Sequence, residues 1–403
     1  MKKNEQFESA LEKIKQIQTR LLRSLPERRR WVSDKIEKRR ATLLIGPRGV
    51  GKTTYLLSNI KGSNESLYLS LDNTLFSTLN LFEFGDWLFN IGYKQIIFDE
   101  VHVAQDWSLH LKSLYDSNPS KKIIASDSST LVLRKGLGDL SRRFVNATIP
   151  FLSFREYLWI KYGFELESTS WRKFISTDYA KATNSILNQF HKQQISVIKE
   201  FRSYLKEGYR PIFLEKDYSE RLTQIVDKII YQDIPYFLPE LKERHIHLMR
   251  NILAFIAESP IPRLNIDSLS SKWQVSKTTV YNLIEVMKET SLIRVIQKKG
   301  SLKSRSRGEK IFFSDPTQYG VSMGNLGNVR EAFFCAEMDR LQLNCFATED
   351  ELQGDFMVDD VLFEVGGESK KSKKADIVLR DNIETSESAK VRPLWLLGFC
   401  ENN

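Results

Sequence analysis

The sequence predicts an α/β protein whose first large domain contains a parallel β-sheet with helices on both faces. Short apolar runs alternate with helical segments over residues 41–165, and few positions in these runs alternate between polar and apolar side chains. Such runs are typical of strands buried on both faces. The first run leads directly into a glycine-rich loop that ends in lysine and threonine. A charged helical region and two smaller units are expected after this sheet.

The composition fits a chain with several domains and sizeable cores. It has 403 residues, of which 41% are hydrophobic and 11% aromatic, and a chain of this size is expected to form two to four domains. No run approaches the ~18 apolar residues that a membrane helix needs, and the N-terminus lacks the apolar block of a signal peptide. The three cysteines form no CxxC pair. We therefore expect a cytoplasmic protein that does not bind a membrane.

The order of the elements follows from the spacing of apolar side chains. Residues 5–22 place apolar side chains at three- and four-residue steps, which predicts an amphipathic helix. Buried strands are expected at ATLLI, LYLSL, QIIFDE and KKIIAS. The predicted divisions are a basic helical arm at 1–40, the domain with the parallel sheet at 41–165, a helical lid or linker region at 166–260, a small helical unit ending in a hairpin at 261–315, and an α+β domain at 316–403.

The loop after the first predicted strand carries the pattern of a phosphate-binding site. Residues 46–53, GPRGVGKT, satisfy G-x-x-x-x-G-K-[ST] in full, and a helix-compatible segment follows. Glycines allow backbone N–H groups to converge on phosphate oxygens, and a helix N-terminus adds partial positive charge. We expect Lys52 to reach the β- and γ-phosphates and the Thr53 hydroxyl to bind Mg²⁺. The residues expected to bind the nucleotide are Gly46, Pro47, Arg48, Gly49, Val50, Gly51, Lys52, Thr53 and Thr54.

A second motif supplies the acidic groups that such a loop requires. Asp99 and Glu100 follow directly after the apolar run IIF. Asp99 is expected to hold Mg²⁺, and Glu100 to orient or deprotonate the attacking water. Glu100 alone gives a reason to expect hydrolysis rather than binding without reaction. His102 is expected to have a packing or capping role. The loop recognises phosphates and not bases, and no guanine-binding N-K-x-D motif is present.

With these motifs in place, the chain resembles the AAA-type P-loop ATPases, in particular the prokaryotic group related to archaeal ATPases. That group carries a winged helix and a C-terminal domain related to restriction endonucleases. The resemblance implies ATP and Mg²⁺ as cofactors, and ATP hydrolysis as the activity. The matching stretches are GPRGVGKTT, IIFDEVHVAQDWSLHLKSLYD, KKIIASDSSTLVL, GLGDLSRRFVNATIPFLSFREYL, YQDIP, KIFFSDP, GNVREAFF and PLWLLGF.

The resemblance also implies roles for residues outside the two motifs. Ser126 matches the polar sensor that contacts the γ-phosphate or the attacking water. Asp127 stands where the family usually has glycine, and a further carboxylate near phosphates is electrostatically unfavourable. Arg142 and Arg143 match an arginine pair that supplies a charge-stabilising finger or sensor, or else forms salt bridges at a domain seam. The expected catalytic residues are Glu100, Lys52, Ser126, Arg142 and Arg143.

The segment expected to form the winged helix has residue types that suit DNA. Residues 266–293 predict two helices joined by a tight turn, with Ser276 as the N-cap of the second. Residues 296–310 contain six Lys/Arg and one Asp/Glu, which is typical of a charged wing. Docking of a protein is the alternative use of such a module. The residues expected to contact DNA are Lys277, Thr278, Tyr281, Asn282, Lys303, Arg305 and Arg307.

The last domain lacks one group that a nuclease of the restriction-endonuclease type needs. Asp355 and Glu364 match the metal-binding carboxylates, and Glu331 lies on a preceding helix. Gly366 occupies the position of the lysine that stabilises charge on water or phosphate. We therefore expect a domain that does not cleave, and that serves oligomerisation, partner binding or DNA binding.

Three functions remain open at this point. The first is an ATP-hydrolysing machine that acts on DNA, with its nucleotide state coupled to the winged helix and the last domain. The second is a slow ATP-dependent regulatory switch that binds a protein partner. The third is an ATP-controlled nuclease.

Overall fold

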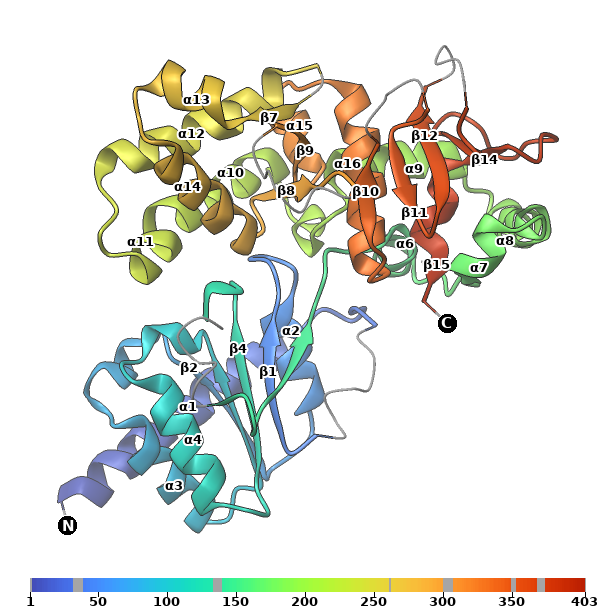
Figure 1. Ribbon diagram of the computed structural model, residues 1–403. Coiled ribbons are helices and arrows are strands. Elements are labelled where there is room, and N and C mark those ends of the chain that lie inside the picture. Colours follow the sequence, from blue (N-terminus) through green and yellow to red (C-terminus); the bar gives the residue numbers. More distant parts are fainter. Residues whose placement is uncertain are drawn as a thin grey trace. The chain divides into compact units, whose positions relative to one another are not determined.

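The computed structural model describes residues 2–31, 39–132, 140–260, 262–299, 307–348, 353–367 and 374–402 (Figure 1). The chain divides into two compact units, Met1–Pro150 and Phe151–Asn403, which are called unit 1 and unit 2 below. The predicted boundary at residue 165 lies inside unit 2, because the helix that follows residue 153 belongs to the second core.

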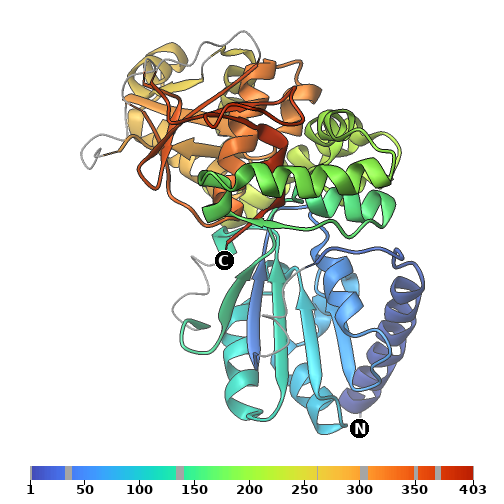
Figure 2. The ribbon, with the colours of Figure 1, turned by 90° about the vertical axis from the view of Figure 1, so that its right-hand side faces the viewer.

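Unit 1 is built on a five-stranded sheet in which every pair of neighbouring strands is parallel. The order is β2 (Ser66–Ser70), β3 (Gln95–Asp99), β4 (Lys122–Asp127), β1 (Ala41–Ile45) and β5 (Val145–Thr148). Figure 2 shows helices on both sides of this sheet, as the apolar runs predict. β4 lies between the strand that leads into the glycine-rich loop and the strand that ends at Asp99.

The helices of unit 1 connect these parallel strands, as crossover topology requires. They are α2 (Lys52–Asn59), η1 (Thr74–Thr78), α3 (Leu81–Asn90), η2 (Val101–Val103) and α4 (Trp107–Ser117). Because all five strands run in the same direction, the carboxyl ends of β1, β3 and β4 meet at one edge of the sheet. Residues at the ends of those three strands are therefore neighbours in space.

The N-terminal helix α1 (Lys2–Arg23) is part of unit 1 and covers the edge of its sheet. Phe7 is buried, and its ring lies 5.3 Å from that of Phe84. The edge strand β2 is also capped by a side chain, because the Tyr68 backbone N–H donates to Gln18 Oε1 at 2.8 Å. The sequence predicts a separate basic helical arm over residues 1–40, whereas α1 packs onto the core of unit 1.

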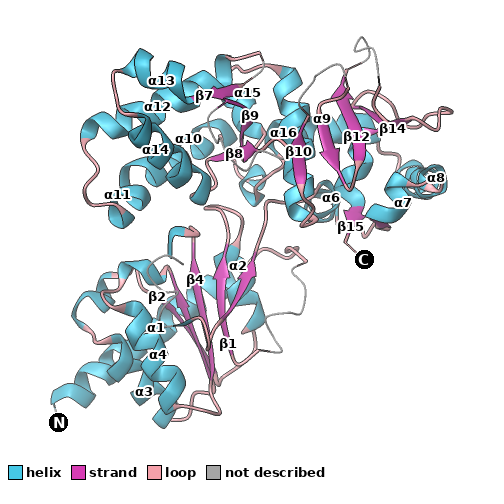
Figure 3. Ribbon diagram, in the orientation of Figure 1, coloured by secondary structure: helices cyan, strands magenta, loops and turns pink. Residues whose placement is uncertain are grey.

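Unit 2 begins with the helical region that the sequence predicts (Figure 3). Its first elements are α6 (Phe154–Tyr162), β6 (Thr169–Ser170), α7 (Trp171–Ile175), α8 (Tyr179–Lys192), α9 (Val197–Glu207), η3 (Pro211–Leu214), α10 (Tyr218–Lys228), η4 (Ile229–Asp233), α11 (Ile234–Phe237) and α12 (Glu243–Glu258). Among the described residues of the whole chain, no helix combines the length and apolarity needed to cross a membrane.

A small antiparallel sheet with two helices follows. Its strands are ordered β7 (Arg263–Asn265), β9 (Arg307–Phe313) and β8 (Ile293–Ile296), and both pairings are antiparallel. The helices α13 (Ile266–Trp273) and α14 (Lys277–Glu289) lie between β7 and β8 in the chain.

The last part of unit 2 is a five-stranded mixed sheet with a helix packed on it. The order is β10 (Cys345–Ala347), β11 (Phe356–Val358), β12 (Val361–Gly366), β13 (Ile377–Arg380) and β14 (Val391–Pro393). The chain reaches this sheet through α15 (Thr317–Val321) and α16 (Leu326–Arg340), and ends in η5 (Leu394–Phe399) and β15 (Cys400–Glu401). The segment η5 is fully buried and joins this sheet to the helical region, since Phe399 packs edge-on against Phe154 at 5.6 Å.

Candidate nucleotide-binding site

The glycine-rich loop runs from the end of β1 to the start of α2, and three of its glycines are required by its shape. Gly49 and Gly51 have φ values of 80° and 92°, a region that residues with a Cβ rarely adopt. A Cβ on Gly46 would lie 2.4 Å from the carbonyl oxygen of Ile149. The loop therefore turns tightly and delivers the chain to the N-terminus of α2, where backbone N–H groups are left for an anion.

Lys52, the first residue of α2, is buried with its ammonium inside this loop. Its Nζ donates to the carbonyl oxygens of Gly46 at 2.8 Å and Pro47 at 3.3 Å. Burial lowers the pKa of Lys52 below its ordinary value, while nearby carboxylates, Glu100 first, oppose that shift. The side chain thus carries its charge to the place where the loop would receive a polyphosphate.

Asp99, at the end of β3, is the centre of a dense set of hydrogen bonds. Its Oδ2 accepts from the hydroxyls of Thr53 at 2.7 Å and Tyr68 at 2.6 Å. Its Oδ1 accepts from the Ser126 hydroxyl and from the Glu100 backbone N–H. Burial, together with Asp99, raises the pKa of Tyr68, so the phenol stays protonated and keeps donating. Side chains from β2, β4 and α2 thus meet at the carboxylate that ends β3.

The residues predicted to bind Mg²⁺ fit a hard cation. Thr53 and Asp99 present hydroxyl and carboxylate oxygens within 2.7 Å of each other, and Mg²⁺ prefers oxygen ligands of this kind. The two residues are 46 positions apart in the chain, so their contact is predicted only by the way the two motifs combine in a phosphate-binding site, and not by any local pattern. Ser126, expected as a sensor, lies against the same carboxylate.

Glu100 adopts a backbone conformation that is uncommon for a residue with a side chain. Its φ and ψ are 54° and 52°, in the left-handed region. Its Oε1 lies 3.9 Å from the Arg48 guanidinium, and its Oε2 lies 3.6 Å from Nδ1 of His102. Burial raises the pKa of the Glu100 carboxyl, and Lys52 and Arg48 act against this rise.

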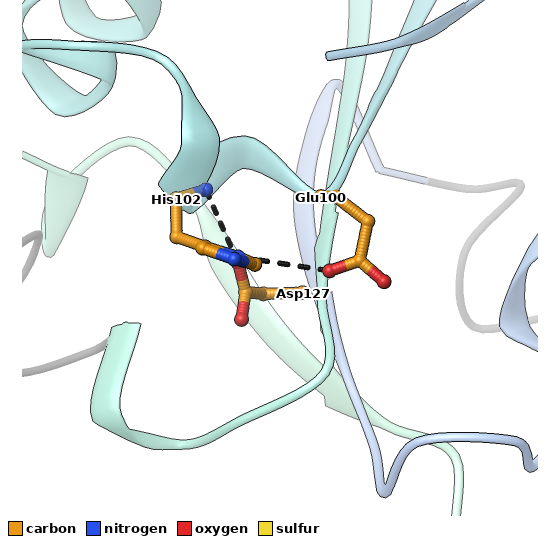
Figure 4. A group of neighbouring side chains, drawn as sticks. All are labelled: Glu100, His102 and Asp127. Atoms are coloured by element: carbon orange, nitrogen blue, oxygen red, sulfur yellow. Dashed lines mark hydrogen bonds and ion pairs between the residues drawn. The ribbon is translucent and has the colours of Figure 1, made fainter. Parts of the chain in front are cut away.

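A buried pair stands next to Glu100, between β4 and η2 (Figure 4). Asp127 is fully buried and accepts twice from His102, from the ring Nδ1 at 2.7 Å and from the backbone N–H at 3.2 Å. Asp127 also accepts from the Ser129 backbone N–H. Ligand atoms of Glu100, His102 and Asp127 lie within 4.8 Å of one another, a spacing that a metal ion can bridge. Asp127 and His102 already satisfy each other by direct hydrogen bonds.

From the sequence, Asp127 is expected near the phosphates and His102 in a packing or capping role, and no local pattern connects the two residues. The structure places Asp127 against His102. The signals in the sequence are a histidine two residues after Glu100 and an acidic residue at the position where the resemblance implies glycine.

The two arginines expected as finger or sensor have different surroundings. Arg142 is exposed. Arg143 forms two hydrogen bonds with Asp116 at the end of α4, at 2.7 Å and 2.8 Å. Because both partners belong to unit 1, this ion pair is internal to the unit and differs from the alternative prediction of a salt bridge at a domain seam.

The residues expected to contact DNA lie on or after α14. Lys277, Thr278 and Asn282 are exposed, and Tyr281 is half-buried. The Lys277 ammonium lies 2.6 Å from a carboxylate oxygen of Asp267 on α13. Lys303 and Arg305 fall outside the described residues, and Arg307 begins β9 without a described side chain. The prediction that Ser276 caps α14 is confirmed, since its hydroxyl accepts from the Thr279 backbone N–H at 3.1 Å.

The carboxylates of the last sheet are accompanied by a lysine from another strand. Lys310 on β9 is buried, and its Nζ lies 2.7 Å from Glu331 Oε2 and 3.5 Å from Asp355 Oδ1. Asp355 also accepts from the Val365 backbone N–H at 2.9 Å. Glu364, on β12, is buried as well. The basic segment at 296–310, expected as a charged wing, therefore ends in a buried ion pair.

Comparison with known proteins identifies part of this chain. Residues 38–158 match a family model described as an AAA domain. The chain is 30% identical over 308 residues to the uncharacterized protein MJ1637 of Methanocaldococcus jannaschii, a match that covers 69% of this chain and 61% of that protein. The chain thus spans less than two thirds of that relative's length.

Two solved structures are also similar in part. One comes from a study of the structural basis of katanin self-assembly, with 19% identity, a TM-score of 0.24, and coverage of 36% of this chain and 52% of that one. The other is PCH-2 of C. elegans, with 18% identity, a TM-score of 0.21, and coverage of 70% and 68%. The family match and the parallel sheet together assign residues 38–158 to a P-loop fold of the AAA ATPase type.

Proposed function

We propose, on the premise that residues 38–158 form an AAA-type ATPase domain, that this protein hydrolyses ATP with Mg²⁺ and uses the nucleotide state to act on DNA. The observation that carries the proposal is the convergence of the glycine-rich loop, Thr53, Asp99 and Glu100 at the same edge of the sheet. Such a site combines phosphate binding, metal ligands and a general base.

The chain's own residues divide the work of this reaction. The loop amides and the Lys52 ammonium bind and orient the phosphates. Thr53 and Asp99 would hold Mg²⁺, which would supply Lewis-acid stabilisation of the negative charge on the phosphate oxygens. Glu100 orients the attacking water and takes its proton, because its carboxylate is buried beside the loop. Ser126 fixes the Asp99 carboxylate by donating to it.

Two substitutions test this assignment. Lys52→Ala should abolish phosphate release because the phosphates lose their cation, and Glu100→Gln should lower turnover by roughly 10²- to 10³-fold while ATP still binds. Exposed Lys61→Ala and Glu83→Gln serve as matched controls and should leave turnover unchanged. Wild-type turnover in both test variants would overturn the assignment.

We further propose that β7, α13, α14, β8 and β9 form a winged helix that contacts DNA. The order of two helices between antiparallel strands and the exposed polar side chains of α14 support this. Lys277 is the most informative residue, since its ammonium stands at the N-terminal end of α14.

DNA contact is tested by ATP turnover with and without single- and double-stranded DNA over a salt series. Stimulation that fades as salt rises is expected, because phosphate contacts release counterions. Lys277→Ala should reduce the salt slope by about one, whereas Lys288→Ala on the same helix should not. An absence of any DNA response would favour the alternative described next.

The alternative is a slow regulatory switch that binds a protein partner. It is favoured by the pairing of Arg143 with Asp116, which occupies one of the two arginines expected to stabilise charge in the transition state. This function predicts slow turnover that DNA leaves unchanged, together with an oligomeric state that changes with ATP.

For the last domain we propose that it does not cleave DNA. The Lys310 ammonium already pairs with Glu331 and lies near Asp355, and this positive charge disfavours a divalent metal at the same carboxylates. A plasmid incubated with high protein concentrations and Mg²⁺ or Mn²⁺ should stay intact. Cleavage that requires Glu364 would establish instead the third function, an ATP-controlled nuclease.

A further inference from the structure

The proposed mechanism leaves one buried pair of titratable side chains next to the site without a role. Asp127 and His102 are both buried, and they join the end of β4 to the turn that follows β3. A buried aspartate at the end of a strand in a nucleotide site costs free energy unless its carboxylate is satisfied. Here three donors satisfy it, two from His102 and one from Ser129.

We propose that His102, fixed by Asp127, is a positioning residue that holds the Glu100 carboxylate in its place for the attacking water. This inference rests on the proposed ATP hydrolysis. His102 acts on Glu100 in two ways, through the backbone and through the imidazole ring.

The backbone effect follows from the strained turn at Glu100. A left-handed residue with a side chain costs roughly 1–2 kcal/mol, so its neighbours must hold it in place. The next three residues form η2, and the backbone N–H of His102 in that turn donates to Asp127. Asp127 thereby anchors the turn that places Glu100 at the edge of the sheet.

The ring effect follows from the position of Nδ1. Because Nδ1 donates to Asp127 Oδ2, it carries a hydrogen and presents positive charge density. The same nitrogen lies 3.6 Å from Glu100 Oε2, which is buried and accepts no hydrogen bond within the described residues. Arg48 lies 3.9 Å from the other oxygen. The carboxylate of Glu100 is thus held between a guanidinium and an imidazole, with one group at each oxygen.

This arrangement also explains the departure at Asp127 from the glycine usual at this position. Glycine there would leave the His102 ring and backbone N–H without their acceptor. A carboxylate at this position is expected to be unfavourable next to phosphates. Here the Asp127 carboxylate accepts hydrogen bonds from His102 instead of facing the phosphate-binding loop unpaired.

The test compares two substitutions of His102 in wild-type and Glu100→Gln backgrounds. His102→Asn retains a side-chain N–H close to the position of Nδ1, and His102→Leu removes it. We expect His102→Leu to lower kcat by about 10- to 100-fold, the scale of a misplaced reacting group, with the affinity for ATP unchanged. His102→Asn should recover most of the turnover. In the Glu100→Gln background both should have little further effect, because His102 acts through Glu100.

Controls separate folding from function. His110→Gln, on α4, is the matched histidine substitution and should leave kcat unchanged. Thermal unfolding and ATP binding are measured for every variant, and Asp127→Asn supplies a second route if His102→Leu does not fold, since it weakens the same contact.

The outcomes distinguish this inference from the proposed function. If Lys52→Ala and Glu100→Gln turn over like wild type, ATP hydrolysis at this site is refuted. If those variants are inactive but folded His102→Leu and Asp127→Asn keep wild-type kcat, only the positioning role is wrong. An equal loss from His102→Leu in both backgrounds would also overturn it, since His102 would then act independently of Glu100.

Discussion

Lys310 shows how a single buried side chain sets the electrostatic surroundings of two neighbouring carboxylates. It is a buried lysine on β9 whose ammonium contacts Glu331 and Asp355 and lies 4.6 Å from the centre of the Phe356 ring. Burial alone would lower the pKa of Lys310, but the two carboxylates outweigh it and hold the pKa above the ordinary value of 10.5. The ammonium therefore stays charged across the neutral range. The stability that its pairing contributes is fully present below the ordinary pKa of 10.5 and is lost as pH rises through the raised pKa.

Replacing Lys310 by methionine should strongly destabilise unit 2. The substitution keeps the approximate length of the side chain but removes the buried ammonium that contacts Glu331 and Asp355. Removing one partner of a buried ion pair costs about 3–5 kcal/mol. Because the pKa of Lys310 is raised, the loss should be the same at every pH between about 6 and 9. Denaturant unfolding of wild type and Lys310→Met checks this, with exposed Lys299→Met as the control. An unchanged midpoint would show that the ion pair is not formed.

At the scale of elements, helix α1 shows how unit 1 protects the open edge of its sheet. β2 is an edge strand, and an edge strand with free N–H and C=O groups invites pairing with another chain. Gln18 takes the place of a neighbouring strand, since its amide accepts from the Tyr68 N–H and donates to the Ser66 carbonyl. The apolar stripe that predicted this helix is the face that packs on the sheet.

Phe7→Ala should therefore destabilise unit 1, although it lies in a segment that could be taken for a solvated arm. Phe7 is 5% exposed and its ring contacts those of Phe84 and Trp87, so truncation should cost about 3–5 kcal/mol. Ile17→Ala, at a half-buried position of the same helix, should cost much less. The measurement is the unfolding midpoint of the transition that bound ATP shifts. Equal, small effects at both positions would mean that α1 does not pack on the sheet.

Most of the helices and strands of unit 1 could be predicted from the sequence. Local patterns were enough for α1, for the strands at 41–45, 66–70, 95–99 and 122–127, and for the cap at Ser276. They were not enough for β5, because its residues VNAT lie mostly exposed at the other edge and show no apolar run.

The candidate site could be predicted in its parts but not in its contacts. Spacing identified the loop, Asp99 and Glu100, because their chemistry is carried by adjacent residues. The pairs His102–Asp127 and Lys310–Asp355 join segments 25 and 45 positions apart. Such contacts depend on strand order and on where another segment of the chain folds back, and no local pattern encodes either.

At the scale of the whole molecule, the proposed functions separate by unit. All contacts described for the nucleotide site are made by residues of unit 1, from Gly46 to Ile149. The residues proposed to contact DNA all belong to unit 2. Each unit has its own sheet and buried core, so nucleotide binding and DNA binding are expected to be separable.

A fragment of residues 1–150 should accordingly bind Mg²⁺-ATP as the full chain does. Since none of the described contacts of the site is lost, its affinity should lie within about threefold of the full-length value, a difference of roughly 0.6 kcal/mol. Titration calorimetry measures this, and a cooperative thermal transition, shifted upward by the nucleotide, shows that the fragment is folded. Lys52→Ala in the fragment should remove both the heat and the shift.

Turnover of the fragment should not respond to DNA at any salt concentration, whereas that of the full chain should. A folded fragment that binds no nucleotide would show that the site needs groups from residues 151–403, and a fragment still stimulated by DNA would place the DNA contact in unit 1.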